Sequence, residues 1–435
     1  MENNDLDHKL EYKGYWWLPS SPEEQLAGSL MIEKDGKMKL ELYGGFSKEE
    51  DDIIKTFEPK SEPVIYGRCY APNSNMKDIS LFVCRGAVRY NTGSTFIMTS
   101  YTCHYALIGI HVDSMNTPVF FKAMVDYDEL AFWCPSKIIK ASTKENHLLL
   151  DIDISYEDAV PLSTVELEEG LTLNLMDGIT YSIGYPRMNF EQGSYFEINK
   201  DNISAKDTLS VVRKFERFLS VATLKMQEHS RITLQSEMES QEFENGEKRY
   251  HSIELIVPRY EYGKHTENRS HEFLFRYADV AKDFASMYAK YSREKSMDQI
   301  WSNLIYSLEK KRVFTSNDFL VVVQALDGFA IRFRKEEGLY EELKSLRDEF
   351  MGVKGIKQLT DDDLKTAKGS RHYYSHILKM EEKDSKHAVD GSQLLTITRK
   401  LRLLLICCTL SFLGMDVERI NRLVSDCCNS IVRVA

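Results

Sequence analysis

The hydrophobic pattern of the chain changes near residue 265. Before this residue apolar and polar residues alternate, and after it apolar residues recur at helical spacing. Within residues 28–46, the alternation runs on both sides of Asp35-Gly36. This pattern predicts a β-hairpin whose two central turn residues both have positive φ. Further strands are expected at 64–70, 79–84, 94–99, 103–112, 147–155, 171–175, 179–184 and 252–257. Many short strands with turn signals between them are typical of a β-sandwich or barrel.

Helical periodicity interrupts this first part once, over residues 209–219. After residue 265 it is continuous, and helices are expected at 278–291, 297–310, 319–333, 397–413 and 417–432. Ser316 or Asn317 is expected to cap the helix over 319–333, and Asp416 the last helix, which Gly414 separates from the one before it.

One more helix is expected to begin at Thr360 or at one of the three aspartates 361–363, whose negative charge suits a helix N-terminus. It should run to about Met380, with Gly369 as a weak point in its interior. The polar stretch 382–392 is expected to be a loop. The fold class is therefore α+β: a β-rich sandwich or barrel-like domain over 1–264, then an all-α bundle over 265–435.

Composition and charge narrow the function. With 435 residues and 43% hydrophobic content the chain can form real cores, but its net charge of −11 makes it a poor general binder of nucleic acid. Any nucleic-acid site must be a local basic patch. None of the eight cysteines forms a C-x-x-C pair, and the doublets Cys407-Cys408 and Cys427-Cys428 lie in apolar helical patterns, as expected of reduced core thiols.

The localisation is expected to be cytoplasmic. The acidic N-terminus has no apolar stretch of the kind that a signal peptide needs. The most apolar run, Leu403–Met415, is too short to cross a bilayer, so no membrane partner is expected.

The candidate chemistry lies in Arg371-His372-Tyr373-Tyr374-Ser375-His376, where a core helix would carry Leu and Val. RNA carries its own nucleophile, the 2′-hydroxyl, so cleavage needs a base, an acid and a fixed cation. Histidine titrates near neutral pH and arginine binds phosphate through two donors, so no metal and no cofactor is required. Lys365, Lys368 and Lys379 add positive charge nearby.

The spacing of Arg371 and His376 is weak evidence taken alone, because it arises readily by chance. Residues five apart on a helix lie about 140° apart around its axis, so the two side chains would not share one face. Two motifs brought together by a two-fold axis could form a composite site. Activity is therefore expected to require a dimer.

Two other interpretations of these residues remain open. His372 and His376 are four apart and share a helix face, as zinc ligands can, but Tyr373 stands where the H-E-x-x-H pattern has Glu, and no third ligand follows. Alternatively, Arg371 pairs with a carboxylate and the histidines are ordinary surface or core groups.

The motif resembles the signature of HEPN domains, in which Arg is followed by a polar residue, three further residues and His on a late helix. The opening of the chain, Gly14–Pro19 followed by Gly28-Ser29-Leu30 and Leu40–Gly45, resembles the N-terminal domain of ApeA-like HEPN proteins. Phe319–Arg334, with Gln324-Ala325-Leu326-Asp327, is similar to the family's second bundle helix. Together the resemblance spans nearly the whole chain.

The resemblance implies a dimeric or higher oligomeric bundle and a metal-independent endoribonuclease of anti-phage defence by abortive infection. It implies catalytic roles for Arg371, His376 and the variable polar position His372. Around them we expect RNA contacts from Lys368, Tyr373, Tyr374 and Lys379. The substrate would be RNA, with tRNA and mRNA both open. Some HEPN domains are non-catalytic binding partners, so an antitoxin-like binding protein is the alternative.

The N-terminal part offers no nucleophile motif or phosphate loop, so we expect a regulatory or recognition domain, with a phage-derived trigger as its ligand. Trp16-Trp17 are interpreted as strand aromatics that pack a core, with a base-stacking platform as the alternative. A metal site built from scattered polar residues lacks any diagnostic spacing; these residues are His104, His111, Asp113, Asp126 and Asp128.

Overall fold

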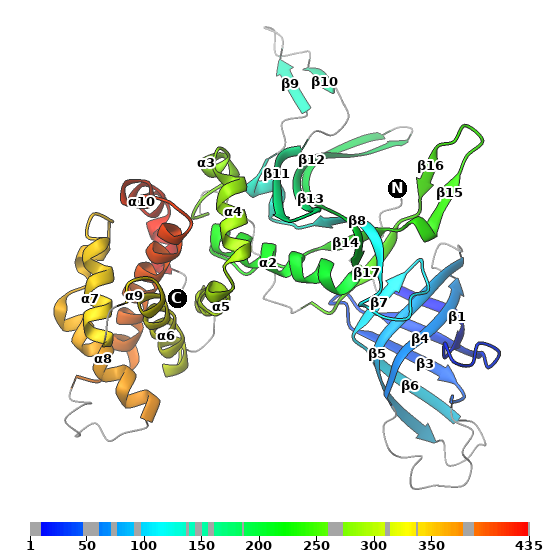
Figure 1. Ribbon diagram of the computed structural model, residues 1–435, viewed down its shortest axis with the longest axis horizontal. Coiled ribbons are helices and arrows are strands. Elements are labelled where there is room, and N and C mark those ends of the chain that lie inside the picture. Colours follow the sequence, from blue (N-terminus) through cyan, green and yellow to red (C-terminus); the bar gives the residue numbers. More distant parts are fainter. Residues whose placement is uncertain are drawn as a thin grey trace.

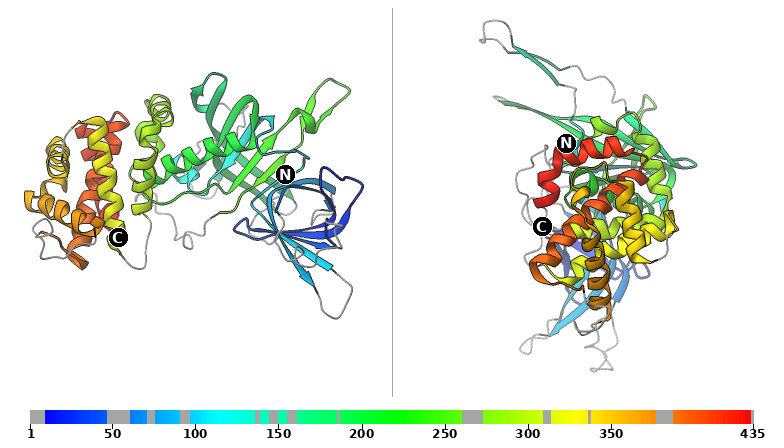
Figure 2. Two further views of the ribbon diagram at one scale, coloured as in Figure 1. Left: turned by 60° about the horizontal axis from the view of Figure 1, so that its bottom comes forward. Right: turned by 90° about the vertical axis from the view of Figure 1, so that its left-hand side faces the viewer.

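The computed structural model describes residues 10–46, 61–70, 76–90, 97–135, 139–143, 150–154, 161–184, 187–259, 273–308, 314–335, 338–376 and 387–433. The chain has an N-terminal β-rich part that contains a barrel and a C-terminal helical part, which confirms the α+β class (Figure 1). The barrel lies at one end of an elongated molecule and the last helices lie at the other (Figure 2).

The barrel is a closed antiparallel sheet. Its strands are β1 (Leu10–Trp17), β2 (Leu26–Ile32), β3 (Met38–Tyr43), β4 (Ser61–Tyr70), β5 (Met76–Tyr90) and β6 (Ile97–Cys103). They follow the order β5-β4-β1-β2-β3-β6, and β6 pairs back with β5 to close the ring. Alternate residues of β2 and β3 point into a core that contains Trp16, fully buried. Trp17 is buried as well, but on the other face of the sheet, where its ring meets those of Tyr66 and His111, so only Trp16 packs the barrel core as expected.

The hairpin expected over 28–46 is formed by β2 and β3, paired from Gly28–Leu42 to Ile32–Met38. Its turn differs from the expected one. The Gly36 N–H donates to the Glu33 carbonyl at 2.8 Å, and the Glu33 N–H donates to Lys37 at 2.9 Å. Only Gly36 has positive φ, at 74°, so the expectation of positive φ at both Asp35 and Gly36 was wrong. A three-residue loop needs a left-handed residue only after its turn.

The sheet continues from β5 into a second, open region. Its order is β7-β17-β14-β8-β13-β12-β11, and its strands are β7 (Tyr105–Ile108), β8 (Pro118–Asp126), β11 (Pro161–Glu168), β12 (Leu171–Gly184), β13 (Arg187–Ser204), β14 (Arg231–Gln235) and β17 (Ile253–Ile256). Two short hairpins, β9 (Ile139–Thr143) with β10 (Leu150–Ile154) and β15 (Ser240–Glu242) with β16 (Lys248–Tyr250), stand apart from it. Helix α1 (Leu130–Trp133) and the 3-10 turn η2 (Glu237–Glu239) complete this region.

Several strand expectations need correction. The expected strands at 171–175 and 179–184 are one strand, β12, because Gly178 pairs with Gly193 and the ladder with β13 continues through it. No range was expected for several of the strands, namely β1, β8, β9, β11, β13, β14, β15 and β16. The expected strand 103–112 is β7 alone, and parts of the expected strands 94–99 and 147–155 lie outside the described residues.

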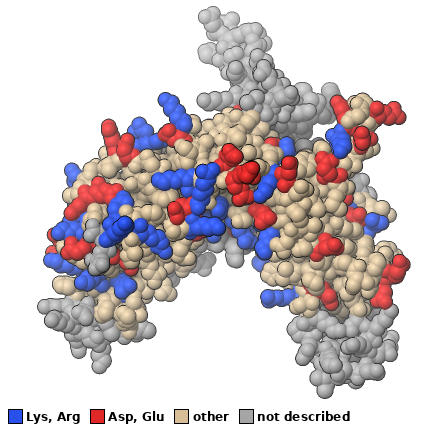
Figure 3. All heavy atoms as spheres, in the orientation of Figure 1, with Lys and Arg blue, Asp and Glu red and all other residues tan. Residues whose placement is uncertain are grey.

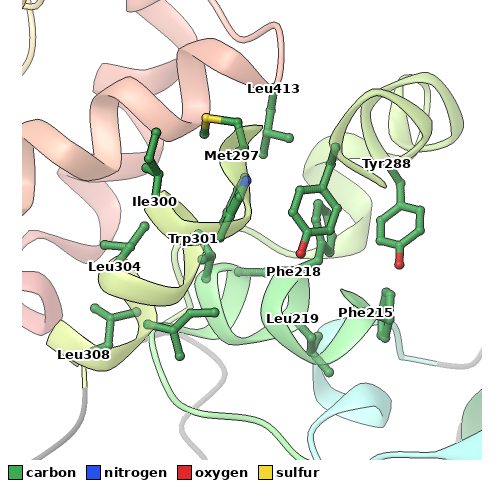
Figure 4. Close-up of a cluster of buried hydrophobic side chains, with 14 of the residues drawn as sticks. Phe215, Phe218, Leu219, Tyr288, Met297, Ile300, Trp301, Leu304, Leu308 and Leu413 are labelled. Atoms are coloured by element: carbon green, nitrogen blue, oxygen red, sulfur yellow. The ribbon is translucent and has the colours of Figure 1, made fainter. Parts of the chain in front are cut away.

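Helix α2 (Ala205–Thr223) joins the open sheet to the helices. Its first turn is capped by Ser204, whose Oγ accepts from the Asp207 N–H at 3.1 Å. Its apolar face packs against β8 and β13 on one side and against α5 (Asp298–Leu308) on the other. The side chains of Phe215, Phe218 and Leu219 point into the same cluster as Tyr288 and Trp301 (Figure 4). One hydrophobic core therefore runs from the open sheet into the bundle.

The first helices after residue 265 lie against the sheet. They are α3 (Tyr277–Val280) and α4 (Phe284–Arg293), and the 3-10 turn η4 (Lys295–Met297) leads from α4 into α5. α4 packs on β11, where the Arg293 guanidinium donates to the Leu167 carbonyl at 3.3 Å and to the Glu166 carbonyl at 3.0 Å.

The rest of the bundle is α6 (Ser316–Phe333), α7 (Leu339–Glu349), η5 (Ile356–Gln358), α8 (Asp361–His376), α9 (Gly391–Phe412) and α10 (Val417–Arg433). α7 was not expected. Thr315 caps α6 through a reciprocal pair with Asp318, so the expected caps Ser316 and Asn317 were wrong. Thr360 caps α8 and Asp416 caps α10, as expected.

None of the described helices is long and apolar enough to cross a membrane. The six cysteines whose side chains are described are buried and form no disulfide. The side chains of Cys427 and Cys428 lie outside the described residues.

The shared core gives a stability prediction. Phe218 is fully buried and contacts the rings of Tyr288 and Phe284, so Phe218→Ala should lower the free energy of unfolding by about 3–5 kcal/mol. The matched control is Phe132→Ala, whose ring is exposed and whose loss should cost less than about 1 kcal/mol. Guanidinium chloride unfolding followed by tryptophan fluorescence measures both. Equal effects of the two substitutions would contradict this account of the core.

Candidate functional site

Helix α8 carries the motif and lies at the end of the molecule away from the barrel (Figures 1 and 2). It packs on α6, α7 and α9. Its buried residues are Leu364, Ala367, Gly369 and Ser370, and the motif residues that follow are half-buried or exposed. The helix thus keeps its small and apolar residues inside and turns its polar chemistry toward the surface.

Gly369 is not a break in α8, because the helix is continuous from Asp361 to His376. A Cβ at Gly369 would lie 3.2 Å from the carbonyl carbon of His387, so glycine allows the segment before α9 to approach the helix. The Ser370 Oγ accepts from the Val389 N–H at 3.2 Å, and the Tyr374 hydroxyl donates to the Val389 carbonyl at 3.0 Å. These two hydrogen bonds join α8 to the segment that precedes α9.

Arg371 points toward α6 and α7. Its Nη2 lies 3.8 Å from Oδ2 of Asp327, and the Arg371 side chain is 40% exposed. Glu342, from the first turns of α7, lies beside Asp327 and is 3% exposed. A guanidinium that keeps part of its surface open can bind a phosphate on one side while a carboxylate holds it on the other.

His372 and His376 lie side by side one turn apart, with ring centroids 4.9 Å apart at 61°. His376 is exposed and His372 is half-buried. The helix is regular over the motif, so His376 and Arg371 leave it in different directions, as the residue spacing predicts. One chain therefore brings together the two histidines, and separately Arg371 with two carboxylates.

The other candidates occupy the same helix. Lys368 is exposed. Tyr373 and Tyr374 meet edge to face at 4.8 Å, and burial, together with the charge of Asp390, raises the pKa of Tyr374. Because its hydroxyl donates a hydrogen bond to the Val389 carbonyl, Tyr374 stabilises the local structure, whether or not it also contacts a ligand. Lys379 lies outside the described residues.

Two residues near the motif were missed by sequence reasoning, namely Asp327 and Glu342. Asp327 carries a signal, since it is a carboxylate within the otherwise apolar stripe of α6. Glu342 carries none that the pattern could reveal, because it follows Glu341 in a helix that was not expected.

No group of three or more His, Cys, Asp or Glu side chains is placed to hold a metal ion among the described residues. In the barrel part, His111 instead stacks on Tyr66 at 4.5 Å, with its Nε2 2.9 Å from the Gly67 carbonyl oxygen.

The charges are unevenly spread over the acidic chain. On the face drawn in Figure 3, Lys and Arg side chains gather over the helical part, where they alternate with acids. Near the motif, Lys400 binds Asp363 at 2.7 Å, and Lys365 lies 3.5 Å from Asp362. Lys368 takes no part in these pairs.

Comparison with known families gives two matches that divide the chain. The ApeA N-terminal domain 1 matches residues 11–291, more than half of the 435 residues, and the Apea-like HEPN domain matches residues 320–419, which contain α8. No curated protein and no solved structure matches the chain.

HEPN domains are generally ribonuclease domains and typically act on RNA as dimers, and the ApeA family implies a nuclease-type effector in anti-phage defence. The matches cover both the β-rich part and the bundle, and they agree with the resemblance of the motif and of the N-terminal residues. The chain therefore belongs to the ApeA-like HEPN family, with ApeA N-terminal domain 1 preceding its HEPN domain.

Proposed function

We propose that this protein is a metal-independent endoribonuclease that cleaves RNA as a homodimer and serves as the effector of abortive infection against phage. One observation carries the proposal: on the regular helix α8, the Arg371 side chain is 40% exposed, while the rings of His372 and His376 lie side by side near the end of the helix. The family match places this helix in a HEPN domain. The site would act in the cytoplasm.

The chemistry follows from these side chains. A histidine takes the proton of the 2′-hydroxyl, whose oxygen attacks the adjacent phosphorus, and the bond from phosphorus to the 5′-oxygen breaks. A second histidine donates a proton to that leaving oxygen. Arg371 stabilises the negative charge that develops on the phosphoryl oxygens. The products are a 2′,3′-cyclic phosphate and a 5′-hydroxyl end, so atoms and protons balance without a metal.

We infer that a dimer is needed to complete the site, because Arg371 and His376 point away from the same α8 helix in different directions. Arg371 faces α6 and α7, whereas His376 is exposed near the end of α8 as described. A two-fold axis beside α8 would bring the histidines of two copies to the same phosphate. Lys368, Tyr373, Tyr374 and Lys379 would hold the flanking RNA, through phosphate contacts from the lysines and base stacking on the tyrosines.

The N-terminal part is proposed to recognise the phage-derived trigger. The division into a recognition domain over 1–264 and a HEPN domain over 265–435 belongs to this proposal. The shared core that α2 forms with α4 and α5 supports communication between the two, since a change in the open sheet would be felt by helices of the bundle.

A non-catalytic HEPN binding protein, comparable to an antitoxin, is the second candidate. The observation in its favour is the ion pair between Arg371 and Asp327, which occupies one side of the guanidinium. Such a protein would bind a partner through α8 and cleave nothing. The purified dimer would then leave RNA intact, and a partner protein would co-purify with it.

The roles of the two residues can be tested by substitution. Arg371→Ala and His376→Ala should each lower the RNA cleavage rate by about 10²–10⁴-fold and abolish toxicity in cells, because one loses the phosphate cation and the other a proton carrier. Matched controls are Arg332→Ala on α6 and His104→Ala in the barrel part, both exposed. Sequencing of RNA ends after induction measures the rate and identifies the substrate. Undiminished cleavage by both site variants would refute the proposal.

The metal-independent mechanism makes a separate prediction. Cleavage by the purified protein should survive EDTA and leave 2′,3′-cyclic phosphate ends, since the 2′-hydroxyl is the nucleophile. The ends are identified by their resistance to ligation until a phosphatase that opens cyclic phosphates is added. Inhibition by EDTA, reversed by zinc, would favour the alternative in which His372 and His376 are metal ligands.

The requirement for a dimer predicts a dependence on concentration. Activity per chain should fall on dilution in parallel with the dimer fraction, because a monomer holds only part of the site. Light scattering measures the dimer fraction, and a fluorescent oligonucleotide reports cleavage at the same concentrations. Constant activity per chain across the dissociation range would show that one copy suffices.

A further inference from the structure

Two acidic side chains from different helices meet beside Arg371. Asp327 reaches from α6 to within 3.8 Å of the guanidinium. Glu342 reaches from α7 to the side of Asp327 and is 3% exposed. Its Oε2 is buried and finds no hydrogen-bond partner among the described residues. The arrangement places two carboxyl groups against one arginine, so the local charges do not cancel if both acids are ionised.

Burial makes that doubly ionised state costly. Removal from water disfavours a charged carboxyl group, and a second carboxylate in contact disfavours it further. Burial comes first and the contact with Asp327 second, and together they raise the pKa of Glu342 to about 7. The backbone N–H of Gly338 and the charge of Arg371 on α8 act in the opposite direction. A carboxyl–carboxylate pair with one proton is thus favoured below neutral pH, and about half of the molecules hold that proton at pH 7.

We propose that Asp327 and Glu342 share one proton and in that state act as positioning residues, which hold the inner side of the Arg371 guanidinium and leave its outer side free for the RNA phosphate. Asp327 then supplies the single negative charge that anchors the arginine. Protonated Glu342 donates its hydrogen to Asp327. The inference rests on the proposed ribonuclease function, since it assigns the phosphate to Arg371.

Loss of the shared proton weakens the affinity of Arg371 for the RNA phosphate. A second negative charge beside Arg371 competes with the phosphate for the guanidinium, so RNA binding weakens as the pH rises through about 7. The proton transfers themselves involve the histidines, so kcat should not follow this change. A pair with only a structural role would affect stability but would leave the pH dependence of KM untouched.

Glu342→Gln tests the proposal, since glutamine keeps the shape and the donated hydrogen bond but cannot ionise. In the wild-type protein, KM for a short RNA should rise about tenfold between pH 6 and pH 8 beyond the effect of the histidines. In Glu342→Gln that rise should be lost, with kcat changed less than about twofold. The matched control is Glu341→Gln, the exposed neighbour, which should behave as wild type.

A second measurement does not depend on cleavage. The pKa of Glu342 is raised in the folded chain, so its contribution to stability is lost as the pH rises from about 4.5 toward 7. The melting temperature of the wild-type chain should therefore fall relative to that of Glu342→Gln over this range, because glutamine cannot ionise. Asp327→Asn, which removes the contacting carboxylate, should move the fall to lower pH.

The possible outcomes test the shared proton and the positioning role separately. A stability profile of Glu342→Gln identical to that of wild type would overturn the shared proton, whatever the enzymology shows. A lost stability slope with an unchanged pH dependence of KM would overturn the positioning role. A chain that cleaves no RNA would overturn the proposed function and the positioning role with it, while the stability profile still decides the shared proton.

Discussion

The aromatic face of α2 is the contact on which the arrangement of the whole chain depends. Phe215 packs on Phe196 of the open sheet, and Phe218, one turn further along, packs on Tyr288 of α4. Each buried aromatic side chain contributes roughly 1.5–3 kcal/mol by leaving water. A single helix therefore belongs to two layers at once. It joins the β-rich part to the helical bundle that contains α8. The two parts therefore share one packed core.

The junction of α6, α7 and α8 contains buried charged groups and not only apolar ones. A folded chain gains little by burying a carboxyl group beside another one, since both prefer water. Glu342 nevertheless lies inside, against Asp327 and below Arg371. Strongly shifted acids of this kind gather at functional sites, where the unfavourable environment serves the chemistry. Under the proposed function, the nearby Asp327 carboxylate would orient the Arg371 guanidinium before a phosphate binds.

Much of this architecture is readable from the sequence. Apolar residues at helical spacing predicted α6, α9 and α10, and Asp35-Gly36 predicted the first hairpin. The missed strands have a physical reason: β13 carries polar residues on a half-covered sheet, and its pairing with β12 and β8 is decided by residues far away in the sequence. The sequence singles out the motif on α8 as a candidate site, but it does not single out Glu342, which becomes notable only through its contact with Asp327 of another helix.

The geometry of α8 bears on why the proposed ribonuclease would need two copies. Arg371 lies beside Asp327 whereas His376 is exposed to solvent, so under the proposed function one copy would not bring both groups to the same phosphate. Under the proposed function, this separation of the groups would keep the effector inactive until two copies assemble. Each half of the proposed site is supported within a single chain. Asp327 lies beside Arg371, and the hydrogen bond from Tyr374 to the Val389 carbonyl holds the end of α8 that carries the histidines. Assembly would then add only the encounter of preformed halves, which keeps the entropic cost of forming the site low.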